Sequence, residues 1–327
     1  MDDMNKTTAE SDAAVDAVLK NTRRGRLANK IVWGCIAAPF ALFWLAMIPF
    51  AFLSGSGGLF TLVISAIPLV IIFFSARAID RALAKRSKHE TTNTLLPDMA
   101  KEFFGPSATF ERKKGIPVAH LKESGFFPGG WKFKTTDMVT GVRKGIQVAF
   151  SDAKVSHSEG AGEEDSVTVY DFSGLWVMCR MSRPIDGSLR LIEGMGGANV
   201  TGNVRFDAKF GVEESAQGIA AAVLTPGFIE SIRRIEFVGG VLLFWLTGWD
   251  LHIAVDFHHD LFEGGGGGGG RKATSKKDVP DKDAAAYRAE FRRELERVAL
   301  LVDEIAKNEH LFRTPATAPQ LPPDIGG

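Results

Sequence analysis

No charged side chain occurs between residues 31 and 76. Two apolar runs fill this stretch, Ile31 to Leu53 and Leu59 to Ser75, and flanking Gly57, Gly58 and Ala76 lengthen the second. A helix needs about 20 apolar residues to cross a bilayer. The residues between the runs, 54–58, are serine and glycine, which is typical of a tight turn. The pattern therefore predicts a transmembrane helical hairpin over residues 31–76.

Two other interpretations of the apolar runs are less consistent with the sequence. A pair of buried core helices would need a large domain packed around all sides of both helices. A cleaved signal peptide would not follow a long polar segment, and a second apolar run would not come directly after it. We therefore expect lipid to surround both runs.

Basic residues flank the hairpin on both sides. The flanking cations are Lys20, Arg23, Arg24, Arg26 and Lys30 before it, and Arg77, Arg81, Lys85, Arg86 and Lys88 after it, with Asp80 the single acid among the latter. Lys and Arg concentrate on the cytoplasmic side of membrane proteins. We expect a multi-pass protein of the bacterial inner (plasma) membrane, with both termini in the cytoplasm.

Juxtamembrane cations also attract anionic lipid head groups. The residues expected to bind them are Arg23, Arg24, Arg26, Arg81, Lys85 and Arg86. The net charge is zero, and no dense basic stretch lies outside the membrane flanks, so nucleic acid is not an expected partner. The two cysteines, Cys35 and Cys179, suit a reducing compartment, because they are too far apart in the predicted organisation to form a disulfide framework.

The chain divides by composition into five parts. A partly helical cytoplasmic segment (1–30) precedes the hairpin (31–76), and a basic juxtamembrane helix (77–96) follows it. Residues 97–313 form a cytoplasmic domain, interrupted by a glycine-rich linker at 264–280 that includes seven consecutive glycines and is expected to be disordered. The proline-containing tail, 314–327, is also expected to be disordered.

Strand patterns dominate the first part of the cytoplasmic domain. Ile146, Val148 and Phe150 alternate with less apolar residues after a hairpin turn at 143–145, and Val167 to Met181 is rich in β-forming residues. The alternation of apolar residues from Val204 to Phe210 predicts a further half-buried strand. A short helix is expected over residues 98–104, ended by Gly105.

The second part combines a helix start, two strands and a long helix. Thr225 and Pro226 are typical of a helix N-terminus. Residues 238–246 predict an interior strand. A turn at residues 247–250 would then reverse the chain into a second strand at 251–258. Apolar residues recur at helical spacing through 283–308, which predicts an amphipathic C-terminal helix lying on the sheet. The expected fold class is a transmembrane α-hairpin plus an α+β domain with a mainly antiparallel sheet.

The order of these features resembles domain-of-unknown-function family 3137, a family of uncharacterised bacterial two-span membrane proteins. The resemblance covers roughly residues 15–313. It rests on the basic helix, the two spans and three short motifs: Ser124-Gly125-Phe126-Phe127-Pro128, Phe172-Ser173-Gly174-Leu175-Trp176 and Leu224-Thr225-Pro226. The resemblance implies no activity, cofactor or catalytic residue, because none is established for the family. The heptaglycine stretch and the histidine-rich strand at 250–260 depart from the family pattern.

The histidine-rich strand holds the candidates for metal binding, Asp256 and His258. Residues two apart in a strand point to the same face, about 7 Å from one another, so these two side chains are spaced to share one metal ion. A third ligand is needed, and no metal-ligand motif in the sequence supplies it. The alternative, which the sequence favours, is a solvated polar face on an amphipathic strand, and we therefore assign no metal and no cofactor.

Two further features have a structural and a functional interpretation. Phe126, Phe127 and Trp131 lie in one short segment that either contacts a protein partner or the membrane, or fills the core; the core is favoured. Cys179 stands in an apolar β-rich run, where a buried thiol is usually inert packing and not a nucleophile. The seven glycines lack the Lys-Ser or Lys-Thr and the helix that a phosphate-binding loop requires.

The sequence therefore favours a non-enzymatic inner-membrane protein without catalytic residues. Its hairpin would tether an α+β binding or scaffold module, with an unknown protein partner, to the cytoplasmic face. A membrane-tethered metal-dependent enzyme using Asp256 and His258 is the second hypothesis. An accessory subunit of a transport or assembly complex is the third, although the hairpin itself contains no ionisable residue for an ion pathway.

Overall fold

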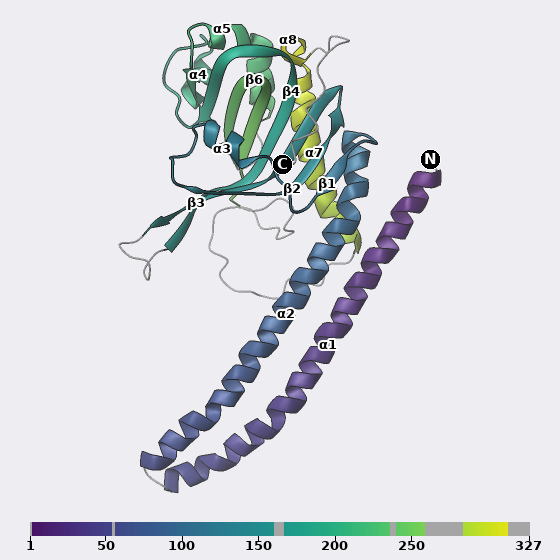
Figure 1. Cartoon of the computed structure of the whole chain (residues 1–327), viewed down its shortest axis with the longest axis vertical. Helices are drawn as coiled ribbons and strands as arrows, with labels where there is room; N and C mark the ends of the chain where they lie inside the picture. The colour runs from purple at the N-terminus through teal and green to yellow at the C-terminus, as the bar shows by residue number, and fades with distance from the viewer. Residues whose placement is uncertain (1, 54–55, 160–166, 236–239, 259–283, 313–327) are drawn as a thin grey trace. The chain divides into compact units, whose positions relative to one another are not determined.

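The computed structural model describes residues 2–53, 56–159, 167–235, 240–258 and 284–312 (Figure 1). The predicted linker at 264–280 and tail at 314–327 lie outside the described residues. The chain forms two compact units, one comprising residues 1–95 and 282–285, the other residues 96–281 and 286–327. Each unit is described by itself below.

The first unit consists mainly of two long helices, α1 (Asp2–Leu53) and α2 (Ser56–Phe104), which lie side by side (Figure 1). Asn29 joins them: its side-chain amide donates to the carbonyl oxygen of Ala76 at 3.2 Å and to Asp80 Oδ1 at 2.7 Å. Gly25 lies beside Leu83, so the helices run in opposite directions.

Two predicted boundaries in α2 are wrong. The helix begins at Ser56, inside the segment expected to be a turn. It then continues without a break to Phe104: the basic juxtamembrane helix prolongs the second apolar run, as expected, but the predicted boundary between it and a separate short helix at 98–104 is absent. The end itself was predicted correctly, because Gly105 follows with a φ of 87°, a conformation that terminates helices.

One helix among the described residues is long and apolar enough to cross a membrane, within Glu10–Ala46 of α1. The most apolar stretch of this helix is not buried by the rest of the described chain. The core helix of a water-soluble domain, by contrast, would be mostly buried. In the described part of α2, large apolar side chains are also exposed, including Ile67, Val70, Ile71, Phe73 and Phe74.

The second unit is built on a six-stranded antiparallel sheet. Its strands pair in the order β1-β2-β3-β4-β5, and β6 pairs with β4. The strands are β1 (Thr109–Glu111), β2 (Lys132–Arg143), β3 (Ile146–Glu159), β4 (Val167–Glu193), β5 (Phe210–Glu214) and β6 (Val241–Asp256). The sheet and its flanking helices show the expected α+β class.

The β2–β3 connection confirms the turn predicted at residues 143–145. Arg143 pairs with Ile146, which leaves Lys144 and Gly145 as a two-residue loop. Both have positive φ angles, 52° and 79°, as the favoured turn of two-residue hairpins requires.

Strands β4 and β6 are long, and both fold back on themselves (Figure 1). Residues 174–180 of β4 pair with residues 250–256 of β6, and residues 185–192 pair with residues 243–248. The predicted reversal at residues 247–250 is therefore present, inside one continuous strand. Since the rings of Trp245 and His252 stack at 4.8 Å, the two arms of β6 lie close together between the arms of β4.

Helices pack at the ends of the strands and on both faces of the sheet. They are α3 (Val118–Glu123), α4 (Val204–Lys209), α5 (Ile219–Val223), α6 (Pro226–Arg234), α7 (Ala284–Ala306) and α8 (Glu309–Phe312). The Thr225 hydroxyl accepts a hydrogen bond from Phe228 N at 3.2 Å, which confirms the predicted cap. The apolar stripe of α7 is buried as predicted, at Phe291, Leu295, Val298, Val302 and Ile305.

The strand predicted from Val204 to Phe210 is wrong. Residues 204–209 form α4, and β5 begins only at Phe210. Asn203 caps the helix by accepting a hydrogen bond from Phe206 N at 3.2 Å. The buried Asp207 carboxylate also accepts from the backbone and the hydroxyl of Thr201, at 3.1 and 2.9 Å. These local bonds outweigh the alternating pattern.

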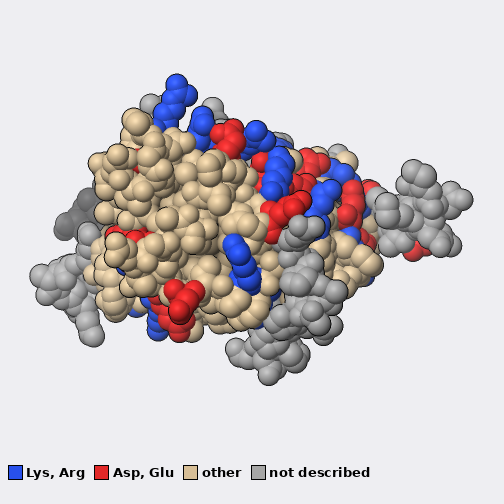
Figure 2. All heavy atoms as spheres, turned by 90° about the horizontal axis from the view of Figure 1, so that it is seen from above, with Lys and Arg blue, Asp and Glu red and all other residues tan. Residues whose placement is uncertain are grey.

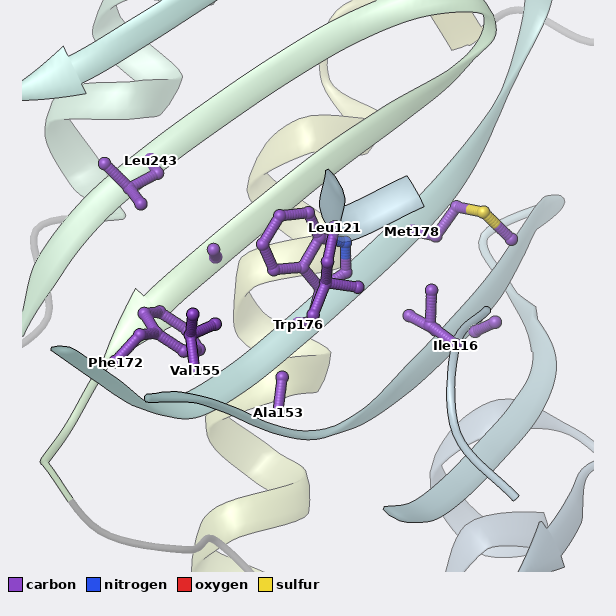
Figure 3. Packing of buried hydrophobic residues seen from close by; sticks show 10 residues of the cluster. Ile116, Leu121, Ala153, Val155, Phe172, Trp176, Met178 and Leu243 are labelled. Carbon is purple, nitrogen blue, oxygen red and sulfur yellow. The ribbon is translucent and has the colours of Figure 1, made fainter. Parts of the chain in front are cut away.

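The apolar core lies on both faces of the sheet. On the face away from α7, a cluster surrounds Trp176, with Ile116, Leu121, Val155, Phe172 and Leu243 among its buried members (Figure 3). On the surface seen from above, Lys and Arg are interspersed with Asp and Glu beside a wide area without charged side chains (Figure 2).

Candidate functional site: a buried histidine beneath an aromatic segment

Strand register places an unusual polar side chain inside the Trp176 cluster. In the β4–β6 ladder, Met178 is opposite His252 and Trp176 is opposite Ala254. Residues directly opposite one another point to the same face of a sheet. His252 therefore extends into the core from the middle of β6 and has no exposed surface.

Three aromatic neighbours hold the His252 ring. The indole Nε1–H of Trp176 donates to His252 Nδ1 at 3.1 Å. The Trp245 ring stacks on the imidazole at 4.8 Å and 27°, and the His120 ring lies 5.1 Å away at 35°. His120 comes from α3, so this contact joins the helix to the sheet.

The hydrogen bond from Trp176 determines the tautomer of His252. Because Nδ1 accepts a proton donor, the ring proton of the neutral imidazole must lie on Nε2. The Nε2 atom is buried and has no hydrogen-bond partner among the described residues. A buried donor without an acceptor costs about 1–3 kcal/mol. The core therefore retains an unfavourable polar group at this position.

Burial also prevents the ring from taking up a second proton. Burial, together with a smaller electrostatic contribution from His120, lowers the pKa of His252 from an ordinary value of 6.5 to about 3. His252 is thus neutral near pH 7. In this tautomer neither nitrogen has a lone pair available for a metal ion, which argues against a ligand role for this histidine.

An aromatic segment, residues 126–131, covers the same face. Ser124 ends α3, where its hydroxyl donates to Leu121 O at 2.7 Å, and Gly125 takes a φ of 69°. After this turn, the Phe126 ring lies against Trp176, with ring centroids 6.3 Å apart, and the Phe127 ring lies against Phe172, with centroids 5.7 Å apart. This turn explains why glycine occupies the second position of the Ser124-Gly125 motif.

The aromatic side chains predicted as a partner or membrane contact are partly buried. Phe126, Phe127 and Trp131 all pack against the Trp176 cluster. Trp131 also stacks on the imidazole of His157 at 4.9 Å, and His157 Nδ1 lies 2.5 Å from an oxygen of Asp171. The arrangement agrees with the core interpretation, yet the three side chains keep part of their surface accessible.

The weak metal candidates, Asp256 and His258, do come together. His258 Nδ1 lies 3.2 Å from Asp256 Oδ1, which also accepts hydrogen bonds from the backbone N–H groups of Ser173 and His258. Asp256 is buried, whereas the His258 side chain is 64% exposed. Among the described residues, no group of three His, Cys, Asp or Glu side chains is arranged to hold a metal ion. His259 and Asp260 lie outside the described residues.

The expected alternative to the metal site, a solvated polar face on this strand, is wrong. His252, Ala254 and Asp256 occupy the face predicted to be wet, and all three are buried. Because apolar side chains cover both faces of this strand, it has no wet side.

Cys179 is completely buried beside the Arg180–Asp250 ion pair, in which the two side chains lie 3.1 Å apart. Burial raises the pKa of the Cys179 thiol to about 12, and the charge of Asp250 contributes to the increase. The thiol is therefore protonated near pH 7, and a protonated thiol is a poor nucleophile.

A second candidate surface lies on the helices of the first unit. The contacts of Asn29 with Ala76 and Asp80, and of Gly25 with Leu83, place residues 23–30 of α1 level with residues 76–86 of α2. The two basic flanks consequently lie at the same height. Asp80, the single acid, is already bound to Asn29.

Comparison of this chain with protein-family models, with curated proteins and with solved structures found no match.

Proposed function

We propose that this chain is an integral protein of the bacterial inner membrane. In this proposal the apolar parts of α1 and α2 cross the bilayer as a hairpin, and the α+β domain lies in the cytoplasm as a binding or scaffold module. The relation to domain-of-unknown-function family 3137 is also part of the proposal. The order of the motifs supports it, whereas no family model matches the chain.

One observation carries the proposal: in the part of α1 and α2 whose side chains are described, many large apolar side chains are exposed. Leu42 and Phe43 of α1 are 68% and 58% exposed, and Phe74 of α2 is 63% exposed. Fully burying one such side chain is worth about 1.5–3 kcal/mol. Exposing a whole row of them to water is therefore too costly for a water-soluble helix pair, whereas lipid accommodates them.

The basic residues at one end of both helices support the orientation. They include exposed Arg23 and Arg24 on α1 and exposed Arg77, Arg81 and Arg86 on α2. A hairpin with basic residues at the open end places that end in the cytoplasm. We further propose that these residues bind anionic lipid head groups.

We do not extend the proposal to catalysis. The described residues bring no third His, Cys, Asp or Glu to Asp256 and His258, and the thiol of Cys179 is protonated. A folded domain with a partly accessible aromatic segment is best explained as a binding module. Its protein partner is left open.

Two measurements on the full chain test the topology. A fluorescent protein that matures only in the cytoplasm and alkaline phosphatase, active only outside it, are fused in turn to Gly327, and the membranes are washed with alkaline carbonate. The hairpin predicts fluorescence, no phosphatase activity and retention in the pellet. Phosphatase activity would show one crossing instead of two, and release by carbonate would exclude an integral membrane protein.

A further inference from the structure

We propose that α3 and the aromatic segment form an acid-released cover on the sheet, held closed by the contact between the imidazole rings of His120 and His252. The inference depends on contacts inside the second unit only, and it holds whether or not the proposed membrane topology is correct.

The cover is attached where the two imidazoles meet. The ring centroids of His120 and His252 are 5.1 Å apart. His252 is buried completely, but His120 is half-buried and reaches solvent. The cover therefore contacts the buried ring of His252 at a point next to solvent.

A proton on His252 itself breaks its main contact. Nε2 already carries the ring proton, so a second proton must go to Nδ1. Nδ1 lies 3.1 Å from the Trp176 indole nitrogen, whose N–H would then face another donor. The charged ring keeps no acceptor at either nitrogen, and its most favourable response is to become exposed to water.

The neighbouring charged groups do not compensate for this charge. Asp250, two residues along β6, is paired with Arg180 at 3.1 Å. Arg190, opposite Trp245 on β4, is paired with Glu213 on β5 at 2.8 Å. On α3, Lys122 and Glu123 are exposed, and the Lys122 ammonium lies over the Phe133 ring. Within the described part of the chain, no carboxylate is hydrogen-bonded to either nitrogen of His252.

The direction of the pH effect follows from proton linkage. In the closed form His252 has its pKa lowered to about 3, whereas in an open form the exposed ring regains a value near 6.5. The open form thus binds more protons below pH 6.5, and the closed form is favoured above it. Opening becomes up to tenfold more favourable for each pH unit between these two values.

Opening exposes an apolar surface that is partly covered at neutral pH. Phe126 leaves its position beside Trp176, and Phe127 leaves Phe172. Besides its apolar contacts, which include buried Leu121, the cover is held to β4 by a hydrogen bond that the Arg190 guanidinium donates to Ser124 O at a long 3.4 Å. By contrast, β3, β4 and β6 remain held by their ladders.

Hydrogen exchange measured by mass spectrometry on the full chain in detergent tests this inference. Exchange is compared at pH 7.5 and pH 5.5, after correction for the intrinsic pH dependence of amide exchange. We expect amides of residues 118–131 to exchange about tenfold faster at pH 5.5, whereas those of residues 174–180 and 250–256 keep their protection. An equal acceleration of the strands would mean general unfolding and would overturn the inference.

Three variants identify the groups responsible. His252→Gln keeps an acceptor for Trp176 but cannot be charged, so the acid response should disappear. His120→Gln should weaken it, and this half-buried position tests the inference even where the core variant does not fold. His258→Gln is the matched control, since its side chain is 64% exposed and lies outside the contact. A response that persists in His120→Gln, or that disappears in His258→Gln, contradicts the inference.

Discussion

Single residues in the second unit are constrained by how closely backbones approach one another. Gly174, in the middle of β4, is the clearest example. A Cβ atom added there would collide with the carbonyl oxygen of Val255, and it would lie 2.9 Å from Phe257 N and 3.1 Å from Asp256 Cα. All three are backbone atoms, which cannot rotate away as a flexible side chain can. The glycine of the Phe172-Ser173-Gly174-Leu175-Trp176 motif is therefore explained by strand contact.

Replacing Gly174 by alanine should consequently destabilise the fold. Overpacking of this kind costs about 1–3 kcal/mol, and each kcal/mol lowers the melting temperature of a domain of this size by roughly 2–4 °C. Thermal unfolding of the full chain in detergent measures the shift. Gly129→Ala is the matched control, because an added Cβ there meets nothing within 4 Å. Equal melting temperatures for the two variants would show that β6 can move away freely.

At the scale of elements, one side chain joins three of them. Arg143, the last residue of β2, binds both carboxylate oxygens of Asp303 on α7, at 2.8 and 2.6 Å. The Nε–H that binds Asp303 also donates to Ala299 O at 3.2 Å, and Nη1 donates to Phe103 O, near the end of α2, at 2.8 Å. A planar guanidinium makes this set of bonds, whereas the single ammonium of lysine lacks the fork geometry.

We expect Arg143→Lys to lower the free energy of unfolding by about 1–3 kcal/mol, as the loss of charge-assisted hydrogen bonds would. Chemical denaturation of the full chain in detergent gives the value. Arg292→Lys provides a strict comparison, because Arg292 also joins α7 to α2, through Glu102 at 2.6 Å. That pair is more exposed, at 43% and 33%, so its loss should cost less than about 1 kcal/mol. The reverse order of the two effects would disprove the joining role of Arg143.

The elements that were predicted correctly are those whose signals are local. The Lys144-Gly145 turn, the Thr225 cap and the apolar stripe of α7 each depend on residues within a few positions of one another. The strand predicted at Val204 failed because four alternating apolar residues were weighted above the Asn203 cap. The buried state of His252 was missed for another reason: strands and a helix that cover it come from distant parts of the chain.

At the scale of the whole molecule, the charges near the apolar helices are separated in sequence and brought together by folding. Arg24 of α1 and Arg81 of α2 are both exposed, and residues 25 and 29 lie beside residues 76–83. Cations near an anionic membrane surface contribute about 1 kcal/mol each. Because the two flanks lie at one height, they form a single basic surface that attracts anionic lipid more strongly than either flank alone.

The double variant Arg24→Gln, Arg81→Gln should weaken the binding of anionic lipid by the full chain. Losing about 1 kcal/mol per charge corresponds to roughly fivefold per residue at low ionic strength. Co-purified or titrated phosphatidylglycerol, measured against phosphatidylcholine by native mass spectrometry, reports the change. Lys113→Gln, Lys132→Gln removes two exposed charges from the second unit and serves as the control.

Since surface attraction is screened beyond about 10 Å at 0.1 M salt, the difference should shrink as salt is added. If both double variants lose lipid equally, the effect is one of net charge, and the basic ends of α1 and α2 have no special role in binding it.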